Sequence, residues 1–199
     1  MKRIVYAGTQ LDDKMQEDCF YAFLHIRDNE SSYTKKELLE SFEWEMTHPS
    51  WYGPEYDVGQ DIKDWYAQLS GPEQQQFLQD MVNKVFHIPT KFRVASRLVR
   101  YMKNNYPEEM GGTINTNNGV VNLDYTNGEE AVVFTVLVSD DLQSEPNYFE
   151  YRKQEFGYDL RIPRYISFSP ELADAIIRAC EGELQSPSPK TRQYTTVRF

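Results

Sequence analysis

Apolar residues recur every three or four positions through the first half of the chain, as in helices that bury one face. Two of these runs follow a capping box, in which Ser or Thr precedes Glu by three residues, at Thr34 and Glu37 and at Ser70 and Glu73. Residues 11 to 26 fit a helical period, but residues 20 to 26 also alternate as a strand would, so both assignments stay open there. The first half is therefore predicted to be mainly helical.

The pattern changes to strands after residue 112. Two Asn-Gly pairs predict tight turns, because both residue types tolerate the positive φ that hairpin turns require. The third predicted strand reads AVVFTVLV, so we expect it at the centre of an antiparallel meander, with both of its faces covered. The turns and the strands that they separate are Asn118-Gly119 and Asn127-Gly128, and 113 to 116, 120 to 125 and 131 to 138.

The last part of the chain predicts one hairpin, one helix and one strand. The hairpin turns at Phe156-Gly157, and Pro163 should confine its second strand to a sheet edge or a bulge. The helix spans 171 to 180 and ends at Gly182, and a short terminal strand covers 194 to 199.

These elements predict an α+β fold, with a helical N-terminal half packed on a mainly antiparallel sheet from the C-terminal half. We expect residues 1–199 to form a single domain, because no linker is long enough to force two. Two lobes are possible within it, a helical one over 1–107 and a β-rich one over 112–199. Residues 183–193 are polar and twice interrupted by Pro, which predicts a mobile connector.

The composition of the chain bears on its cellular compartment and on the distribution of its charge. The chain lacks the apolar core of a signal peptide, and no run approaches the length that spans a bilayer, which predicts a cytoplasmic protein that does not enter a membrane. Cys19 and Cys180 are then expected as two buried thiols. The net charge is −10, yet residues 84 to 103 hold six bases and no acid, so an acidic body is crossed by one basic segment.

Spacing gives little support to catalysis. The three His and two Cys form no zinc pattern, and no nucleophile elbow or phosphate-binding loop occurs, so we predict no catalytic residue, no metal site and no cofactor. The best exception is Asp140-Asp141, which follows the most apolar strand and could ligate Mg²⁺. With His48 and a basic helix residue, these carboxylates define an alternative, a metal-dependent enzyme that acts on a phosphate-containing substrate.

Two binding surfaces remain. The helix predicted to begin at Thr90 carries Arg93, Arg97 and Arg100 along one face, and arginines of this kind suit phosphates. We weigh this against a structural interpretation, in which the three arginines pair with the acidic helices of the same molecule, and we favour the structural one. Direct contact with nucleic acid through the 91–103 basic helix is therefore the second alternative function.

The other surface is acidic and aromatic. Exposed Trp and Tyr anchor protein interfaces, while carboxylates steer a basic partner toward them. We therefore predict a non-catalytic binding protein that occupies or inhibits a basic macromolecular partner. The predicted partner is a protein with a basic surface, and mimicry of a nucleic acid is one way to occupy it. The predicted partner-binding residues are Glu43, Trp44, Trp51, Tyr52, Glu55, Tyr56 and Asp57.

Overall fold

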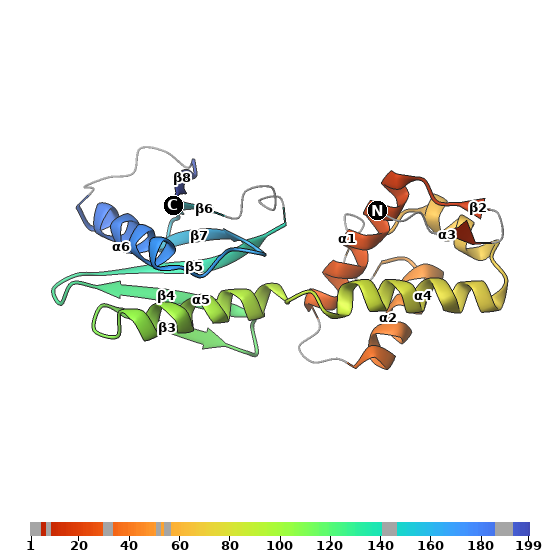
Figure 1. The fold of residues 1–199 in the computed structure, drawn as a ribbon, viewed down its shortest axis with the longest axis horizontal. Helices are drawn as coiled ribbons and strands as arrows, with labels where there is room; N and C mark the ends of the chain where they lie inside the picture. Colours follow the sequence, from red (N-terminus) through yellow and green to blue (C-terminus); the bar gives the residue numbers. More distant parts are fainter. Residues whose placement is uncertain are drawn as a thin grey trace. The chain divides into compact units, whose positions relative to one another are not determined.

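The structure is a computed structural model that describes residues 5–6, 9–29, 34–50, 53, 57–140, 147–185 and 193–199 (Figure 1). The chain divides into two compact units, Met1–Ile88 and Pro89–Phe199. The boundary lies at 88–89, whereas the sequence suggested a join near 107 to 112. The helix that follows the boundary therefore belongs to the second unit.

Unit 1 is mainly helical. The region that fitted two periods is a helix, and the two capping boxes are confirmed: Thr34 Oγ1 accepts from Glu37 N at 3.2 Å, and the Glu73 carboxylate accepts from Ser70 N at 2.9 Å. One apolar core joins the four helices, with Phe23 stacked on Phe42 at 4.1 Å between ring centroids. The elements are β1 (Val5–Tyr6), β2 (Thr9–Gln10), α1 (Asp13–Asn29), α2 (Lys35–Thr47), α3 (Gln60–Ala67) and α4 (Gly71–Phe86).

Unit 2 is a six-stranded sheet with two helices. The strand order is β3-β4-β5-β7-β6-β8, and all neighbours are antiparallel except β5 and β7, which are parallel. Both Asn-Gly turns are confirmed, with Gly119 at φ 65° and Gly128 at φ 93°. The elements are α5 (Lys91–Asn105), β3 (Met110–Asn115), β4 (Val120–Thr126), β5 (Ala131–Ser139), β6 (Tyr148–Lys153), β7 (Tyr158–Pro163), α6 (Pro170–Gln185) and β8 (Thr195–Arg198).

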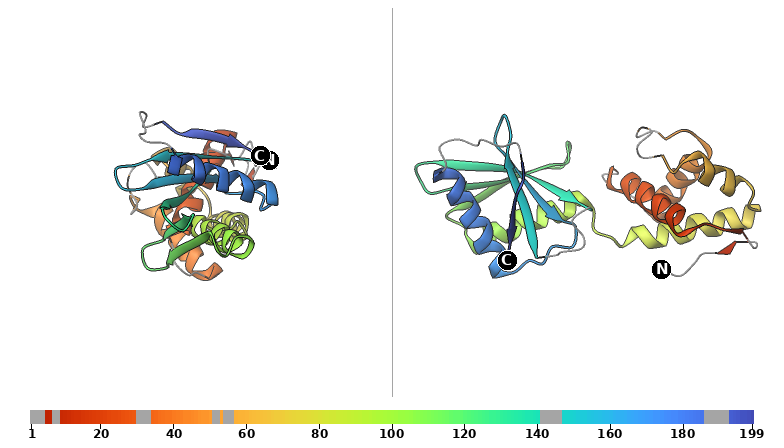
Figure 2. Two further views of the ribbon diagram at one scale, coloured as in Figure 1. Left: turned by 90° about the vertical axis from the view of Figure 1, so that its left-hand side faces the viewer. Right: turned by 90° about the horizontal axis from the view of Figure 1, so that it is seen from above.

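Both helices of unit 2 cover the same face of the sheet (Figure 2). The apolar strand β5 is central, as predicted, but only alternate residues of it are buried. Val133 and Leu137 are 42% and 38% exposed, so the prediction that both faces are covered is wrong. The β-branched and apolar residues of β5 therefore reflect the strand propensity of these residue types as much as burial of both faces.

The α+β class is confirmed, while several details differ from the predictions. Pro163 ends β7, which lies inside the sheet between β5 and β6, and as the last strand residue it interrupts little of the ladder. Gly182 lies within α6 and does not end it. Of the predicted connector 183–193, residues 183–185 are therefore helical and 186–192 lie outside the described residues.

Gly112 determines how closely α5 approaches the sheet. A Cβ atom at Gly112 would lie 2.5 Å from both Asn122 O and Val99 Cγ1. We expect Gly112→Ala to lower the free energy of unfolding by about 1–3 kcal/mol, because the clash with the β4 backbone cannot relax. Chemical denaturation measures this. The matched control is Gly111→Ala, whose Cβ would meet Asp124 Cβ at an ordinary 3.6 Å, and an equal loss in both variants would contradict the assignment.

Candidate functional site

Helix α5 presents three arginines on the face opposite its buried side. Thr90 caps the helix, since its Oγ1 accepts a hydrogen bond from Arg93 N at 3.0 Å. The side that packs on the sheet is apolar apart from one serine, and Arg93, Arg97 and Arg100 are all exposed. Residues spaced by four and then three positions share one helical face, so the arginines form a single stripe. The buried residues are Val94, Ala95, Ser96, Leu98, Val99 and Met102.

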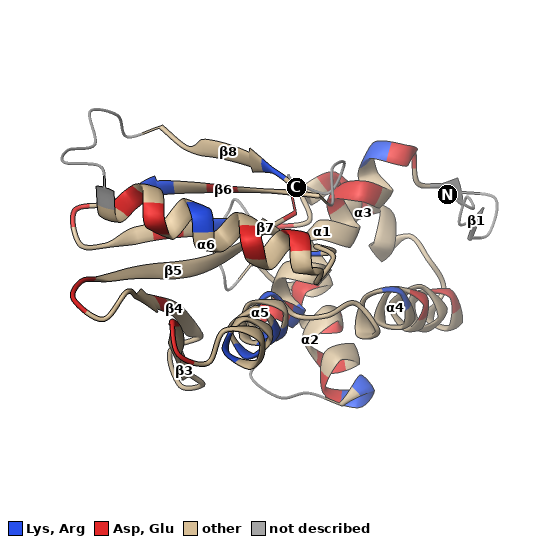
Figure 3. Cartoon of the chain, turned by 60° about the vertical axis from the view of Figure 1, so that its left-hand side comes forward, with Lys and Arg blue, Asp and Glu red and all other residues tan. Residues whose placement is uncertain are grey.

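Within the described residues of unit 2, none of the three arginines forms an ion pair with a carboxylate. The acidic helices that the structural interpretation pairs with them belong to unit 1, so that interpretation stays a prediction. Figure 3 shows Lys and Arg gathered on α5. Lys91, at the start of the same helix, differs: its Nζ lies 3.2 Å from Asp140 Oδ2.

The connecting segment, residues 164–169 between β7 and α6, runs alongside α5. At one end, Arg164 Nη1 donates to Pro89 O at 2.8 Å, just before the α5 cap. Further on, the Phe168 ring lies 5.0 Å from the Arg97 guanidinium carbon and 5.5 Å from the Tyr101 ring centroid. Arg164 thus contacts the chain just before α5, and Phe168, later in the connecting segment, contacts Arg97, later in α5. The connecting segment therefore runs in the same direction as α5 and borders the arginine stripe.

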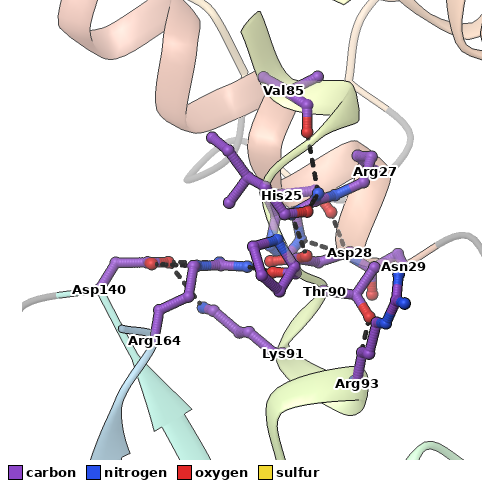
Figure 4. Close-up of polar contacts among 12 residues, drawn as sticks. His25, Arg27, Asp28, Asn29, Val85, Thr90, Lys91, Arg93, Asp140 and Arg164 are labelled. Atoms are coloured by element: carbon purple, nitrogen blue, oxygen red, sulfur yellow. Dashed lines mark hydrogen bonds and ion pairs between the residues drawn. The ribbon is translucent and has the colours of Figure 1, made fainter. Parts of the chain in front are cut away.

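Arg164 and Asp140 form a buried bidentate pair (Figure 4). Arg164 Nε and Nη2 donate to the two Asp140 carboxylate oxygens at 2.6 and 2.9 Å, and the Arg164 side chain is fully buried. Burial alone would raise the pKa of Asp140, but the hydrogen bonds and charges of Arg164 and Lys91 outweigh it and lower the pKa below its ordinary value.

This pair changes the interpretation of Asp140 as a metal ligand. Its carboxylate is already engaged by two cations, while Asp141 lies outside the described residues. His48 belongs to the other unit. Among the residues that the structure describes, no three His, Cys, Asp or Glu side chains come together as a metal site. The geometry therefore gives the enzymatic alternative no support.

A second buried arginine, Arg27, lies in unit 1. Its Nη1 donates to Val85 O at 2.9 Å and also to Ile88 O, and its Nη2 pairs with Asp28 at 2.9 Å (Figure 4). These carbonyls lie at and just beyond the C-terminal end of α4, where carbonyls lack helical partners. Arg27 is thus a structural cap. No local sequence pattern predicts this cap, since its acceptors are 58 and 61 residues away.

The predicted partner-binding residues have different positions. Trp51, Tyr52, Glu55 and Tyr56 lie outside the described residues. Glu43 and Trp44 are exposed on α2, and the Trp44 ring stacks on His48 at 4.5 Å between centroids.

Asp57, another predicted partner-binding residue, is held by contacts within unit 1. It pairs with Lys63 Nζ at 2.9 Å and accepts hydrogen bonds from the backbone N–H groups of Ser50 and Gly59. Burial would raise the pKa of Asp57, but these hydrogen bonds and the charge of Lys63 lower it. Asp57 therefore links Ser50 to Gly59 and Lys63 at the start of α3.

A polar hollow of about 560 Å³ lies between α2 and α3. Its lining includes Glu43 and Asp64, both exposed, together with His48 and the Asp57–Lys63 pair. Two carboxylates without a counterion among the described residues give the hollow a negative charge. It is the concave part of the acidic surface predicted from the sequence.

Glu45 lies behind this surface and is 1% exposed, with Oε1 lacking a hydrogen-bond partner among the described residues. Burial raises the pKa of Glu45, and a hydrogen bond from Ser50 and the charge of Lys63 offset this only in part. A raised pKa means that the folded state favours the protonated form. Stability from this group is therefore complete below its ordinary pKa of 4.5 and falls as the pH rises above it.

We expect Glu45→Gln to stabilise the protein relative to wild type at neutral pH, with a gain that shrinks toward pH 4.5. Thermal unfolding across pH 4.5 to 8 measures the difference. Glu43→Gln, an exposed change two residues away on α2, should show no such trend. A gain that grows toward acid pH would contradict the assignment.

Other expectations concern cysteines and membranes. Cys19 and Cys180 are both free and buried, as predicted, and burial raises the pKa of Cys180 to about 12. In the described parts of the chain, no helix has both the length and the apolar content needed to cross a bilayer.

Comparison with protein-family models, with curated proteins and with solved structures finds no match for this chain.

Proposed function

We propose that this chain is a binding protein whose second unit contacts the phosphate backbone of a nucleic acid through α5. One observation carries the proposal: Arg93, Arg97 and Arg100 share the exposed face of one helix without an ion pair to a described carboxylate of their own unit. Guanidinium groups in this state keep their donors available for phosphate oxygens, which they bind in a bidentate manner.

The spacing of the stripe fits several phosphates. At a rise of about 1.5 Å per residue, Arg97 and Arg100 lie about 6 and 10 Å along the helix from Arg93. A duplex carries one charge per about 1.7 Å of its axis, so each arginine can meet a different phosphate. The stripe consists of arginines alone, and we assign them to phosphates. Phosphate contacts carry no sequence information, so we expect binding with little sequence preference.

The net charge of −10 is compatible with this proposal because the charge is uneven. Residues 1–88 hold 16 Asp and Glu against 8 Lys and Arg, a net charge of −8, whereas residues 89–199 hold 15 against 13, a net charge of −2. Charges more than about 8–10 Å apart are largely screened at physiological salt, so the stripe acts through its own local field. Binding by three arginines is expected to be weak, with Kd on the order of 10⁻⁴–10⁻⁶ M.

The test is a fluorescence-anisotropy titration of a labelled oligonucleotide duplex with the full chain at about 50 mM salt. We expect saturable binding that weakens as salt is added. A chain that binds neither a duplex nor a single strand at millimolar protein would overturn the proposal.

The acidic surface of unit 1 favours a second candidate, a protein partner with a basic surface. Most carboxylates of the described part of unit 1 are exposed, and Glu43 and Trp44 flank the polar hollow and its His48. Carboxylates spread along helices could also imitate a phosphate backbone. The exposed carboxylates are Asp12, Asp13, Glu17, Asp18, Glu37, Glu40, Glu43, Asp61 and Asp64.

A labelled Lys- and Arg-rich peptide, titrated under the same conditions, tests this second candidate. Binding that Glu43→Lys and Trp44→Ala weaken supports it. Peptide binding that neither change affects, or no binding, counts against it.

A further inference from the structure

We infer that the nucleic acid bound by α5 is single-stranded and that Tyr165 stacks on one of its bases. This inference rests on the proposed function and adds a class of ligand to it. The observation behind it is an exposed aromatic ring held at the border of the arginine stripe: Tyr165 is 50% exposed and belongs to the connecting segment that runs alongside α5.

The backbone on both sides of Tyr165 is fixed. On one side, Arg164 is buried and held by Asp140 and by Pro89 O. On the other, Ile166 is 5% exposed in the core, and its N–H donates to Pro163 O at 3.2 Å, which closes a tight turn around residues 164 and 165. Tyr165 is therefore presented by a rigid turn, so ordering its ring on binding costs little conformational entropy.

Tyr165 lies in the chain between two residues that contact α5 or the residue just before it. Arg164, one residue before it, contacts the chain just ahead of α5, and Phe168, three residues after it, lies against Arg97. A ligand whose phosphates follow the stripe thus has its bases within reach of the connecting segment. Arginines along a backbone and an aromatic ring beside them are the two parts of a surface for single strands.

A duplex cannot use this ring, because its base faces are stacked inside the helix. A single strand exposes them, and stacking on an aromatic side chain tolerates any base. The ring therefore provides a preference for single strands that the arginines alone do not provide, since they contact phosphates in either form.

The experiment compares a labelled oligodeoxythymidine with a duplex of equal length, both titrated with the full chain. For Tyr165→Ala we expect a loss of affinity on the order of tenfold for the single strand and no change for the duplex. Tyr165→Phe keeps the ring and should retain the affinity. The matched control is Phe156→Ala, which removes an 89% exposed ring at the opposite end of β7 and should change neither affinity.

The outcomes separate the two proposals. If Tyr165→Ala binds the single strand as wild type does, or loses affinity for both forms equally, the stacking inference is wrong while backbone binding stands. If the wild-type chain binds neither form, the proposed function itself fails. Thermal unfolding of each variant confirms that Tyr165→Ala leaves the fold intact, as an exposed position requires.

Discussion

Asp140→Ala should destabilise the protein by about 3–5 kcal/mol, because it removes a bidentate carboxylate from a buried guanidinium. Arg164 has a fully buried side chain, and both of its bonds to Asp140 would be lost. Pro89 O, which also accepts from Arg164 Nη1, carries no charge that could replace the carboxylate. Denaturant unfolding followed by circular dichroism measures the loss.

A matched control is Glu150→Ala, which removes a carboxylate from a partly exposed pair with Arg161 at 3.3 Å. Pairs of that kind contribute about 0–1 kcal/mol, because water screens them. Equal losses from the two variants would contradict the assigned role of Asp140.

The same pair predicts a dependence on pH. Because the folded-state pKa of Asp140 is lowered, its contribution to stability is present above its ordinary value of 3.8 and is lost as the pH falls through the lower folded value. The difference in the free energy of unfolding between the wild type and Asp140→Ala should therefore shrink as the pH falls below 3.8.

Reversing the charge of the stripe, in the variant Arg93→Glu, Arg97→Glu, Arg100→Glu, should weaken nucleic-acid binding by at least about 100-fold. Each arginine contributes about 1 kcal/mol or more through a charged hydrogen bond to phosphate, and each glutamate adds repulsion. All three side chains are exposed, so the fold should be retained. Anisotropy titration gives the affinity.

Net charge requires a control of its own, since the triple change moves the chain from −10 to −16. Three other exposed bases of unit 2 provide it when they are reversed together, namely Lys153, Arg178 and Arg198. This control should keep most of the affinity. If it loses as much as the stripe variant, binding depends on overall charge and α5 is not the contact surface.

Local signals in the sequence predicted most elements of this fold. A capping box such as Thr34 to Glu37 or an Asn-Gly turn such as Asn118-Gly119 depends on neighbouring residues alone, and both formed as expected. Local signals do not predict which element a helix packs against. The apolar stripe of α5 indicates a buried face but not what covers it, so α5 was grouped with the helical half although it packs on the sheet.

Long-range pairings were the part that the sequence could not predict. The parallel contact of β5 with β7 has no turn signal, because the two strands are not consecutive. Arg164 binds Asp140 across 24 residues and gave no pattern to detect. The stripe itself is visible from its spacing, but spacing does not show whether a carboxylate of the same unit faces Arg93, Arg97 and Arg100.

The central claim is that these three arginines contact phosphates, and the salt dependence of binding tests it most directly. For a single strand, three phosphate contacts predict that log Kobs falls with log salt at a slope of about −2, and each arginine replaced by Gln should reduce that slope by about 0.7. Near loss of the slope in the triple Gln variant is the predicted result. A slope that stays the same after all three arginines are replaced would contradict the account.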